Sequence, residues 1–339
     1  MRLVSFLDPG AQSRTVRVGE WGDDDVIIDL GRAAVCAQIQ WPFSAADGSP
    51  PVTDMIELIA GGTRGIDWAR EVAAQVRVRG DEMYEGHRLR WRREEVRLLA
   101  PVPRPPSIRD FLMVEEHVRN AYENVAPDER PPYSLQSMAE TPAYYKGNPF
   151  QVFGPDDVIP WPPYTNKMDY ELELALVIGR GGEAIRAEDS DRHIAGYTIF
   201  NDWSARDIQM REMKNGLGPG LGKDFANSLG PCLRTADDFN PLTAQMSARI
   251  DGELWSQGTI SVMLRSFPEL IEWTSQGQAL QPGDILGSGT IGRGCGLELG
   301  RFLTPGAVVE LSVDGIGTLT NRVGEPGSPV RAPLASSQE

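Results

Sequence analysis

The chain of 339 residues is long enough for two domains, and its 40% hydrophobic and 24% charged residues are typical of a globular protein. Its formal net charge of -15 disfavours nucleic acid and anionic membrane surfaces as partners. The odd number and wide spacing of Cys36, Cys232 and Cys295 argue against a disulfide framework or a zinc cluster. The apolar run before Asp8 is too short for a signal peptide and no run of about 18 apolar residues follows, so we expect a cytoplasmic protein.

The first hundred residues are predicted to form a small α+β domain. MRLVSFL and DVIIDL are typical of strands, and residues 55–78 have a helical spacing that is broken at Gly61 and Gly62. His87 follows a polar turn and is expected at the surface. Residues 101–107 are proline-rich and predict an extended linker to a second domain. The 36 glycines and 26 prolines predict many turns, and therefore a β-rich body.

An amphipathic helix is predicted to begin after Ser107, because hydrophobic residues recur at helical spacing at Phe111, Val114, Val118, Ala121 and Val125. Asp110 would lie at the capping-box position of this helix, so a capping role is an alternative to a functional one. His117 would lie on the same face about two turns later. Taken alone, it is as well explained as a packed or exposed helix histidine.

Residues 168–179, MDYELELALVIG, carry the most informative pattern of the chain. They predict a strand with one core face, formed by Leu172, Leu174 and Leu176. The opposite face carries Glu171 and Glu173 and continues with Ala175 and Val177, so it also points into protein. Two buried carboxylates this close are costly unless a cation is present. The alternative is a solvated strand face with two glutamates.

Further candidate residues follow this strand. IAGYTIF predicts another strand with Asp202 at its end, where Asp202 is either a functional carboxylate or a helix N-cap. WSARDIQMREM predicts a short helix that carries Arg206 and Gln209. The glycine-rich GLGPGLGKDF ends near Lys223, and such a loop lets backbone N–H groups and an ammonium approach an anionic substrate.

Two nucleotide-binding patterns are excluded. GSGTIG at residues 287–292 has dinucleotide-binding spacing, but more glycines and LELGRFL, an expected strand, follow it instead of a helix. GLGPGLGK has Leu217 and Asp224 where a phosphate loop needs glycine and Ser/Thr. Downstream, SARIDGELWSQG predicts a hairpin, SFPELIEWTSQG predicts a helix, and residues 325–339 predict a disordered tail.

If four carboxylates of the chain converge, they provide hard oxygen ligands that suit Mg²⁺, Mn²⁺ or Ca²⁺. These carboxylates are Asp110, Glu171, Glu173 and Asp202. The sequence alone does not establish that they meet.

The chain resembles the fumarylacetoacetate hydrolase (FAH) family over about residues 105–324. The matching segments, in family order, are RDF with the later His117, YELELALVIG, NDWSARDIQ, LGKDF, GSGTIG and GLELG. The resemblance implies an α+β, β-rich architecture, with an FAH-like mixed β-sandwich roll as the catalytic domain over residues 108–324 and a small domain before it. It also implies a homodimer and a divalent metal, Mg²⁺ or Mn²⁺ with Ca²⁺ as another option, held by Asp110, Glu171, Glu173 and Asp202.

The family resemblance implies a hydrolase that cleaves a C–C bond in a 1,3-diketo acid, such as an acylpyruvate or a fumarylacetoacetate-like compound. His117, oriented by Glu298, would activate water, and Lys223 would complete the catalytic group. The implied substrate-binding residues are Arg206, Gln209, Tyr145 and Thr290. Alternatives are a metal-dependent keto-acid decarboxylase, isomerase or hydratase, and, from another class, a ligand-binding dimer without catalysis.

The chain departs from the family pattern at three points, one of which is that the family's arginine downstream of the histidine has no clear match in NAYENVAPDER. Met213 and Leu112 stand where fumarylacetoacetase has tyrosines. They disfavour fumarylacetoacetate itself as the substrate, while they leave the implied metal ligands and the implied pair of His117 and Glu298 unchanged.

Overall fold

The computed structural model describes residues 1–9, 14–43, 52, 54–123 and 134–327. In this part of the chain, two large β-sheets form the body of an α+β, β-rich molecule, as the sequence predicts. Among the described residues we find no helix with the length and apolar character that a membrane crossing requires.

Within the first hundred residues, the part that the structure describes contains short strands and three helices. The strands are β1 (Arg2–Leu7), β2 (Val16–Trp21), β3 (Val26–Asp29), β4 (Met83–Tyr84), β5 (His87–Arg88), β6 (Arg90–Arg92) and β7 (Arg97–Leu98). The helices are α1 (Leu30–Ala37), α2 (Met55–Ala60) and α3 (Gly62–Arg79), and a 3-10 turn covers Arg93–Glu95. The predicted break in the helical pattern is confirmed, because α3 begins at Gly62 with a φ of 57°, a left-handed conformation that favours glycine. His87 is exposed, as predicted.

The remaining chain supplies most of both sheets and the helices around their far end. The strands are β8 (Ile108–Phe111), β9 (Tyr144–Gly147), β10 (Val152–Phe153), β11 (Val158–Trp161), β12 (Met168–Asp169), β13 (Leu172–Ile178), β14 (Ile194–Asp202), β15 (Ser204–Ala205), β16 (Asn227–Thr235), β17 (Met246–Ile250), β18 (Glu253–Gly258), β19 (Ile285–Gly287), β20 (Val308–Val313) and β21 (Gly317–Pro326). The helices are α4 (Glu115–Glu123), α5 (Leu135–Glu140), α6 (Arg206–Lys214), α7 (Phe267–Thr274) and α8 (Gly296–Leu299), with 3-10 turns at Ala187–His193 and Ala236–Asp238. The predicted hairpin between β17 and β18 and the predicted helices α6 and α7 are confirmed.

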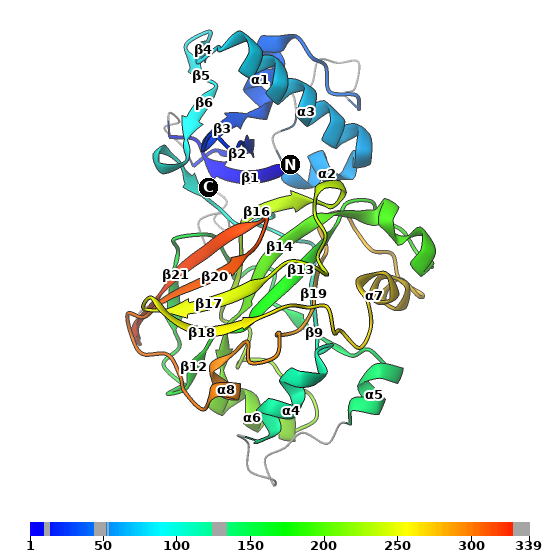
Figure 1. Cartoon of the computed structure of the whole chain (residues 1–339), viewed down its shortest axis with the longest axis vertical. Coiled ribbons are helices and arrows are strands. Elements are labelled where there is room, and N and C mark those ends of the chain that lie inside the picture. Colours follow the sequence, from blue (N-terminus) through cyan, green and yellow to red (C-terminus); the bar gives the residue numbers. More distant parts are fainter. Residues whose placement is uncertain (10–13, 44–51, 53, 124–133, 328–339) are drawn as a thin grey trace.

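The larger sheet runs through both ends of the molecule, in the order β6-β3-β2-β1-β16-β14-β13-β19-β8-β9. Strand β1 pairs antiparallel with β16, and Leu3 lies opposite Leu233. One sheet therefore continues across the predicted division at residues 101–107, and that division stays a prediction. The smaller sheet has the order β11-β21-β20-β17-β18. Figure 1 shows α1 and α3 at one end of the molecule, the sheets in the middle, and α4, α5, α6 and α8 at the other end.

Strand β13 is buried on both faces, as its sequence predicts. Its leucine face, Leu172, Leu174 and Leu176, belongs to the core shared with strands β17, β20 and β21 of the smaller sheet. On the opposite face, Ala175 and Val177 pack in the cluster that contains residues of α2 and α3, such as Leu58 and Val72. That face therefore begins with two glutamates at one end and becomes apolar under the N-terminal helices.

The predicted helix after Ser107 is wrong at its start. Residues 108–111 form β8, which pairs in parallel with β19 and antiparallel with β9. The carbonyl of Ser107 accepts from the N–H of Ile285 at 3.0 Å, and its hydroxyl donates to Asp284 at 2.7 Å. Sheet pairing with distant strands thus overrides the local capping signal, so Asp110 lies on a strand and α4 begins only at Glu115. Val125, the last residue of the predicted pattern, lies outside the described residues.

Two C-terminal predictions also need correction. LELGRFL does not form a strand; its first residues complete the helix α8. The N–H groups of Gly296 and Leu297 both donate to the side chain of Asp169, a distant partner that the local pattern does not reveal. The predicted disordered tail begins later than residue 325, because β21 extends to Pro326. The rest of that tail, residues 328–339, lies outside the described residues.

Candidate active site

Four carboxylates lie together at the end of the larger sheet near α4 and α6. Asp110 lies on β8, Glu173 on β13 with Glu171 just before it, and Asp202 is the last residue of β14. All four side chains are buried, and one oxygen of each lies within 4.8 Å of the others. The structure therefore brings together the four residues whose convergence the sequence analysis assumed.

A glycine makes room for this carboxylate cluster. Gly287 on β19 lies between β13 and β8, opposite Ala175 and Asp110. A Cβ added at Gly287 would collide with Oδ1 of Asp110 and lie 3.0 Å from Oε2 of Glu173. GSGTIG was predicted only as a family segment, and this role of Gly287 was not predicted. Only the strand pairing shows which side chains lie against the glycine.

Burial and like charges perturb the protonation of the cluster. Burial raises the pKa of Asp110 to about 6, and the charge of Glu171 acts in the same direction. Burial raises the pKa of Glu173 well above its usual range, and the charge of Asp110 adds to this effect. For Glu171, the cations Lys223 and Arg206 outweigh the effect of burial and lower the pKa below its usual range. The cluster therefore has less positive charge than four ionised carboxylates require.

The cluster fits a hard divalent cation. Oδ1 of Asp110 is buried and accepts no hydrogen bond from the residues that the structure describes. A buried carboxylate oxygen without a partner is costly, and a bound cation would offset that cost. Four carboxylate oxygens are the donors that Mg²⁺, Mn²⁺ and Ca²⁺ prefer. The donor set is thus compatible with a divalent metal, while the individual ligands and the metal remain predictions.

Lys223 and Tyr145 contact the cluster directly. The buried ammonium of Lys223 donates to Oε2 of Glu171 at 2.6 Å and forms an ion pair with Asp202. Tyr145, which lies opposite Asp110 in the pairing of β8 with β9, donates its hydroxyl to Oδ1 of Asp202. Both predicted residues are therefore at the site, where their immediate partners are carboxylates of the cluster.

His117 and Glu298 form a hydrogen-bonded pair beside the cluster. Nδ1 of His117 lies 2.8 Å from Oε1 of Glu298, and both side chains are buried. Glu298 also accepts from the N–H of Arg293 at 2.6 Å, the N–H of Gly294 at 3.0 Å and the amide of Asn120 at 2.9 Å. Because the carboxylate of Glu298 accepts the N–H of Nδ1, the lone pair of a neutral His117 is on Nε2. Asn120 was missed by the sequence analysis.

The other predicted substrate-binding residues are present, but their polar groups are already engaged. Arg206 is buried, and its guanidinium contacts Asp169, Glu171 and Gln209. Oε1 of Gln209 accepts from Arg206 at 3.0 Å, so the amide nitrogen of Gln209 is not used in this pair. The hydroxyl of Thr290 donates to Oε1 of Glu173 at 3.2 Å. Their roles in substrate binding stay predictions.

All eleven predicted site residues except Glu298 line one cavity of about 310 Å³. The carboxylates, Lys223 and Arg206 form its charged part, and the imidazole of His117 also lines it. The remaining wall is largely apolar and includes Leu112, Val118, Ala121, Met210, Met213 and Leu297. Leu112 and Met213, which replace tyrosines of fumarylacetoacetase, both lie in this wall. The cavity therefore combines charged side chains with an apolar wall.

The glycine-rich loop before Lys223 binds a carboxylate of the protein itself. Glu212, on α6, accepts from the N–H groups of Gly220 at 2.9 Å, Leu221 at 2.8 Å and Gly222 at 3.0 Å. The sequence analysis expected such N–H groups to be available for an anionic substrate, and these three are not. Glu212 was missed because nothing local marks a helix glutamate as the partner of a loop eight to ten residues later.

Comparison with known proteins identifies the family. The model of the family described as fumarylacetoacetate (FAA) hydrolase C-terminal matches residues 107–324. The chain belongs to the fumarylacetoacetate hydrolase family. The match includes every strand and helix that carries a residue of the cavity, so the resemblance stated from the sequence is confirmed.

The FAH-family relatives carry names for more than one reaction. The chain is 33% identical over 305 residues to oxaloacetate tautomerase YisK of Bacillus subtilis, covering 89% of this chain and 94% of the relative. It is 34% identical over 235 residues to the human mitochondrial oxaloacetate tautomerase FAHD2A, covering 68% and 70%. The solved fumarylacetoacetate hydrolase of Exiguobacterium antarcticum has a TM-score of 0.68 at 26% identity, covering 96% and 99%. Family membership thus establishes the fold and the enzyme family, but not C–C bond hydrolysis.

Replacement of Gly287 should disturb the cluster directly. In Gly287→Ala, the added Cβ would displace the carboxylate of Asp110, and we expect Mn²⁺ binding to weaken by roughly tenfold or more. Isothermal titration of metal-stripped protein measures the change. Gly220→Ala is the matched control, since its Cβ would meet nothing nearer than Glu212 at 3.4 Å. Equal Mn²⁺ affinity in the two variants would contradict this account of Gly287.

Metal binding should weaken as the pH falls. Burial raises the pKa of Asp110 to about 6, so below that pH a cation must displace a proton from this carboxyl. The affinity for Mn²⁺ should therefore rise with pH. Protonation of Asp110 alone lowers it by up to about tenfold per pH unit below about pH 6, and the raised pKa of Glu173 adds to this loss. Titrations at several pH values on either side of the pKa test this. An affinity that does not change with pH would show that protons do not compete at the cluster.

The contact between Glu212 and the glycine-rich loop should control the order of that loop. In Glu212→Gln, the amide has a single acceptor oxygen, and its NH₂ group would face backbone donors. We expect faster hydrogen exchange in residues 216–223, measured by mass spectrometry. The control is Glu272→Gln, the same change on α7, which should leave this segment unchanged. Equal protection of the loop in both variants would rule out the role given to Glu212.

Proposed function

We propose that the chain is a divalent-metal-dependent tautomerase of a short 2-keto acid, with oxaloacetate as the first substrate to test. One observation carries the proposal: the imidazole of His117 and the carboxylate cluster line the same cavity. Keto–enol exchange needs a base near a carbon and positive charge near the adjacent oxygen. The names of the relatives from Bacillus subtilis and human, at 33% and 34% identity, favour this reaction over hydrolysis.

In this proposal His117 moves the proton. With its Nδ1–H donated to Glu298, Nε2 accepts a proton from the carbon beside the keto group, the electron pair of that C–H bond forms a C=C bond, and the π pair of the carbonyl moves to the keto oxygen. Uptake of a proton by that oxygen gives the enol. In the reverse direction the oxygen loses its proton, and His117 returns a proton to the carbon to give the keto form. The hydrogen bonds to Glu298 from His117, Asn120, the thiol of Cys295 and the N–H groups of Arg293 and Gly294 hold the imidazole in one orientation, which a base needs for repeated turnover.

The charged side chains that line the cavity would bind the keto-acid head group. Asp110, Glu171, Glu173 and Asp202 would hold a divalent cation, which supplies a Lewis acid for the oxygens of an enolate. We assign the amide nitrogen of Gln209 to hydrogen bonding with the substrate. Lys223 keeps Glu171 and Asp202 in place and adds positive charge beside the carboxylate cluster.

Hydrolysis of a C–C bond is the second candidate, and the apolar wall of the cavity favours it. A cavity of about 310 Å³ is larger than oxaloacetate needs. The apolar acyl group of a 1,3-diketo acid would suit the apolar wall of this cavity. His117 would then take a proton from water, and the hydroxide would add to the distal keto carbon. Cleavage of the C–C bond would release a carboxylic acid and the enolate of pyruvate.

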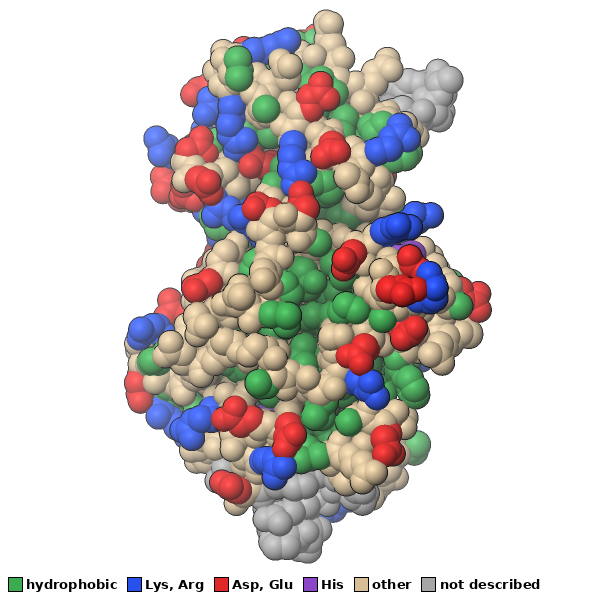
Figure 2. Space-filling model, turned by 45° about the vertical axis from the view of Figure 1, so that its right-hand side comes forward, with side chains coloured by type: hydrophobic (Ala, Val, Ile, Leu, Met, Phe, Trp, Pro, Cys, Tyr) green, Lys and Arg blue, Asp and Glu red, His purple; other side chains and the backbone are tan. Residues whose placement is uncertain are grey.

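We also propose that the enzyme is a homodimer that acts in the cytoplasm. Figure 2 shows hydrophobic side chains gathered over the middle of one face, and a contiguous apolar surface is typical of protein–protein contacts. The human relative is named as mitochondrial, so the proposed cytoplasmic location of this chain differs from that of the human relative. Light scattering of the purified protein tests the dimer.

Removal of the base should abolish tautomerisation without loss of metal. In His117→Asn, we expect the rate of oxaloacetate enol–keto exchange, followed by the ultraviolet absorbance of the enol, to fall roughly 10² to 10⁴-fold. The affinity for Mn²⁺ should stay near that of the wild type, because the carboxylate cluster is intact. His193→Asn is the matched control, since that imidazole contacts the carbonyl of Arg180 and does not line the cavity. Wild-type activity in His117→Asn would refute the role of this base.

A panel of substrates separates the two candidate reactions. The same assay with acylpyruvates, with the products identified by mass, detects the addition of one water across a broken C–C bond. That product, together with slow exchange of oxaloacetate, would make the chain a hydrolase. Loss of carbon dioxide from oxaloacetate would indicate a decarboxylase. Asp202→Asn should lose both Mn²⁺ binding and activity in either case.

A further inference from the structure

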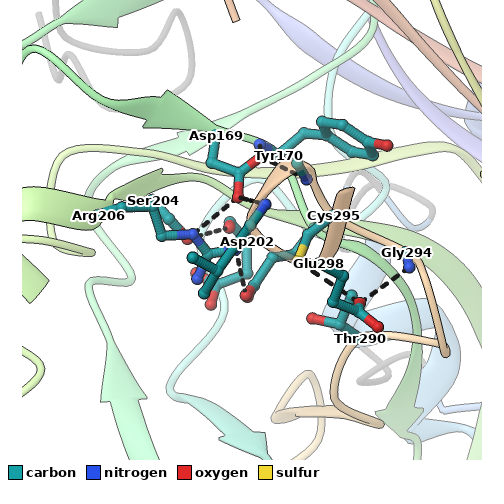
Figure 3. Close-up of polar contacts among 12 residues, drawn as sticks. Asp169, Tyr170, Asp202, Ser204, Arg206, Thr290, Gly294, Cys295 and Glu298 are labelled. Atoms are coloured by element: carbon teal, nitrogen blue, oxygen red, sulfur yellow. Dashed lines mark hydrogen bonds and ion pairs between the residues drawn. The ribbon is translucent and has the colours of Figure 1, made fainter. Parts of the chain in front are cut away.

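Asp169 is a buried carboxylate that does not line the cavity and has no part in the proposed proton transfer. Its side chain nevertheless accepts hydrogen bonds from two separate parts of the candidate active site. Oδ1 accepts from the N–H of Gly296 at 2.7 Å, while Oδ2 accepts from the N–H of Leu297 at 2.9 Å and from Nε of Arg206 at 2.8 Å. Figure 3 draws Asp169 together with Arg206, Cys295 and Glu298.

The first contact leads to the carboxylate cluster. Nε of Arg206 donates a hydrogen bond to Asp169, and Nη2 forms an ion pair with Oε1 of Glu171 at 2.8 Å that lacks hydrogen-bond geometry. Its Nη1 donates to Gln209 at 3.0 Å. The guanidinium is planar and rigid, and because each of its three nitrogens contacts a neighbouring side chain, it has little freedom to move. The position of Asp169 therefore fixes the position of Arg206, and through it that of the Glu171 carboxylate.

The second contact leads to the histidine pair. Gly296 and Leu297 are the first two residues of α8, and Glu298 follows them directly. Gly296 packs closely against Asp169, because a Cβ added there would lie 2.5 Å from Oδ1. The two backbone hydrogen bonds thus hold the start of α8, and Glu298 in turn holds His117.

The charge of Asp169 also matters for Glu171. Arg206 now shares its positive charge between two carboxylates, Asp169 and Glu171. If Asp169 lost its charge, Glu171 would be the remaining carboxylate partner of a buried guanidinium. A bound cation would then compete with a full positive charge for the same carboxylate, and it would bind less tightly.

We propose that Asp169 is a positioning residue that sets the distance between the two halves of the active site, by holding Glu171 through Arg206 and Glu298 through α8. The proposal rests on the proposed function, since it concerns the same cavity. Asp169 touches neither the substrate nor the cation in this account. It is the shared anchor of the group that would bind the metal and the group that would move the proton.

The route through Arg206 predicts a dependence between two substitutions. In Asp169→Asn, Mn²⁺ binding to the metal-stripped full chain should weaken by roughly tenfold or more. In an Arg206→Gln background, the same Asp169→Asn change should alter the Mn²⁺ affinity by less than about twofold, because its route is already cut. A purely structural loss would not depend on Arg206. An equal loss of affinity in both backgrounds would overturn the proposal.

The route through α8 has a readout that needs no metal. Asp169→Asn should speed hydrogen exchange in residues 294–300, with or without Arg206, since the N–H groups of Gly296 and Leu297 lose an acceptor. Wild-type protection of this segment would overturn the second half of the proposal. If the wild-type protein bound no Mn²⁺, the proposed function would fail, and this exchange measurement would still decide the contact with α8.

Two further variants guard against loss of the fold. Asp157→Asn removes another buried carboxylate, which accepts from the N–H of Gly154 at 2.8 Å and from Arg97 at 2.6 Å outside the cavity. It should change neither Mn²⁺ affinity nor exchange in residues 294–300. If Asp169→Asn does not fold, Arg206→Lys keeps the charge but loses the planar fork, and it should weaken Mn²⁺ binding similarly. Unchanged affinity in Arg206→Lys would overturn the route through Arg206.

Discussion

The repulsion among four buried carboxylates within 4.8 Å of one another is the constraint on which the rest of this site depends. Like charges in a poorly solvated interior repel strongly, so each neighbour of the cluster can be understood by how it offsets that repulsion. Lys223 and Arg206 supply positive charge, and the N–H of Gly289 and the hydroxyl of Thr290 donate to Glu173. These groups leave part of the negative charge uncompensated. That remaining charge would favour the binding of a divalent cation.

In the proposed function, the sheet and the helices contribute different parts of the chemistry. Asp110, Glu173 and Asp202 lie on paired strands, whose hydrogen bonds fix their separations, and Glu171 directly precedes β13. His117 and Glu298 lie on the helices α4 and α8. A strand is a rigid support for charges that must stay apart at set distances. A base that accepts and returns a proton instead requires one defined orientation, which the hydrogen bonds to Glu298 provide. The active site therefore depends on how firmly α8 is attached to the sheet.

The sequence predicted best what depends on local spacing. Alternation in MDYELELALVIG predicted a strand buried on both faces, with Glu171 and Glu173 on the same face, and the structure confirms both. The cation site that these glutamates suggested stays a prediction. The prediction failed where distant partners decide the outcome. Asp110 was placed on a helix because its local pattern is helical, whereas pairing with β19 and β9 makes it part of a strand. The engagement of Arg206 by Asp169 and of the glycine-rich loop by Glu212 depends equally on contacts that spacing does not encode.

The spacing of Asp169, Glu171 and Glu173, two residues apart along one segment, limits how this enzyme can change in evolution. An insertion or deletion of one residue within the segment would turn the carboxylates on one side of it away from the others, toward the side where the leucines of β13 fill the core between the sheets. Such a change would bury unpaired charge and empty the active site in one step. Substitution can tune this segment residue by residue, but its length is fixed, so diversification in length must be confined to the loops around the cavity.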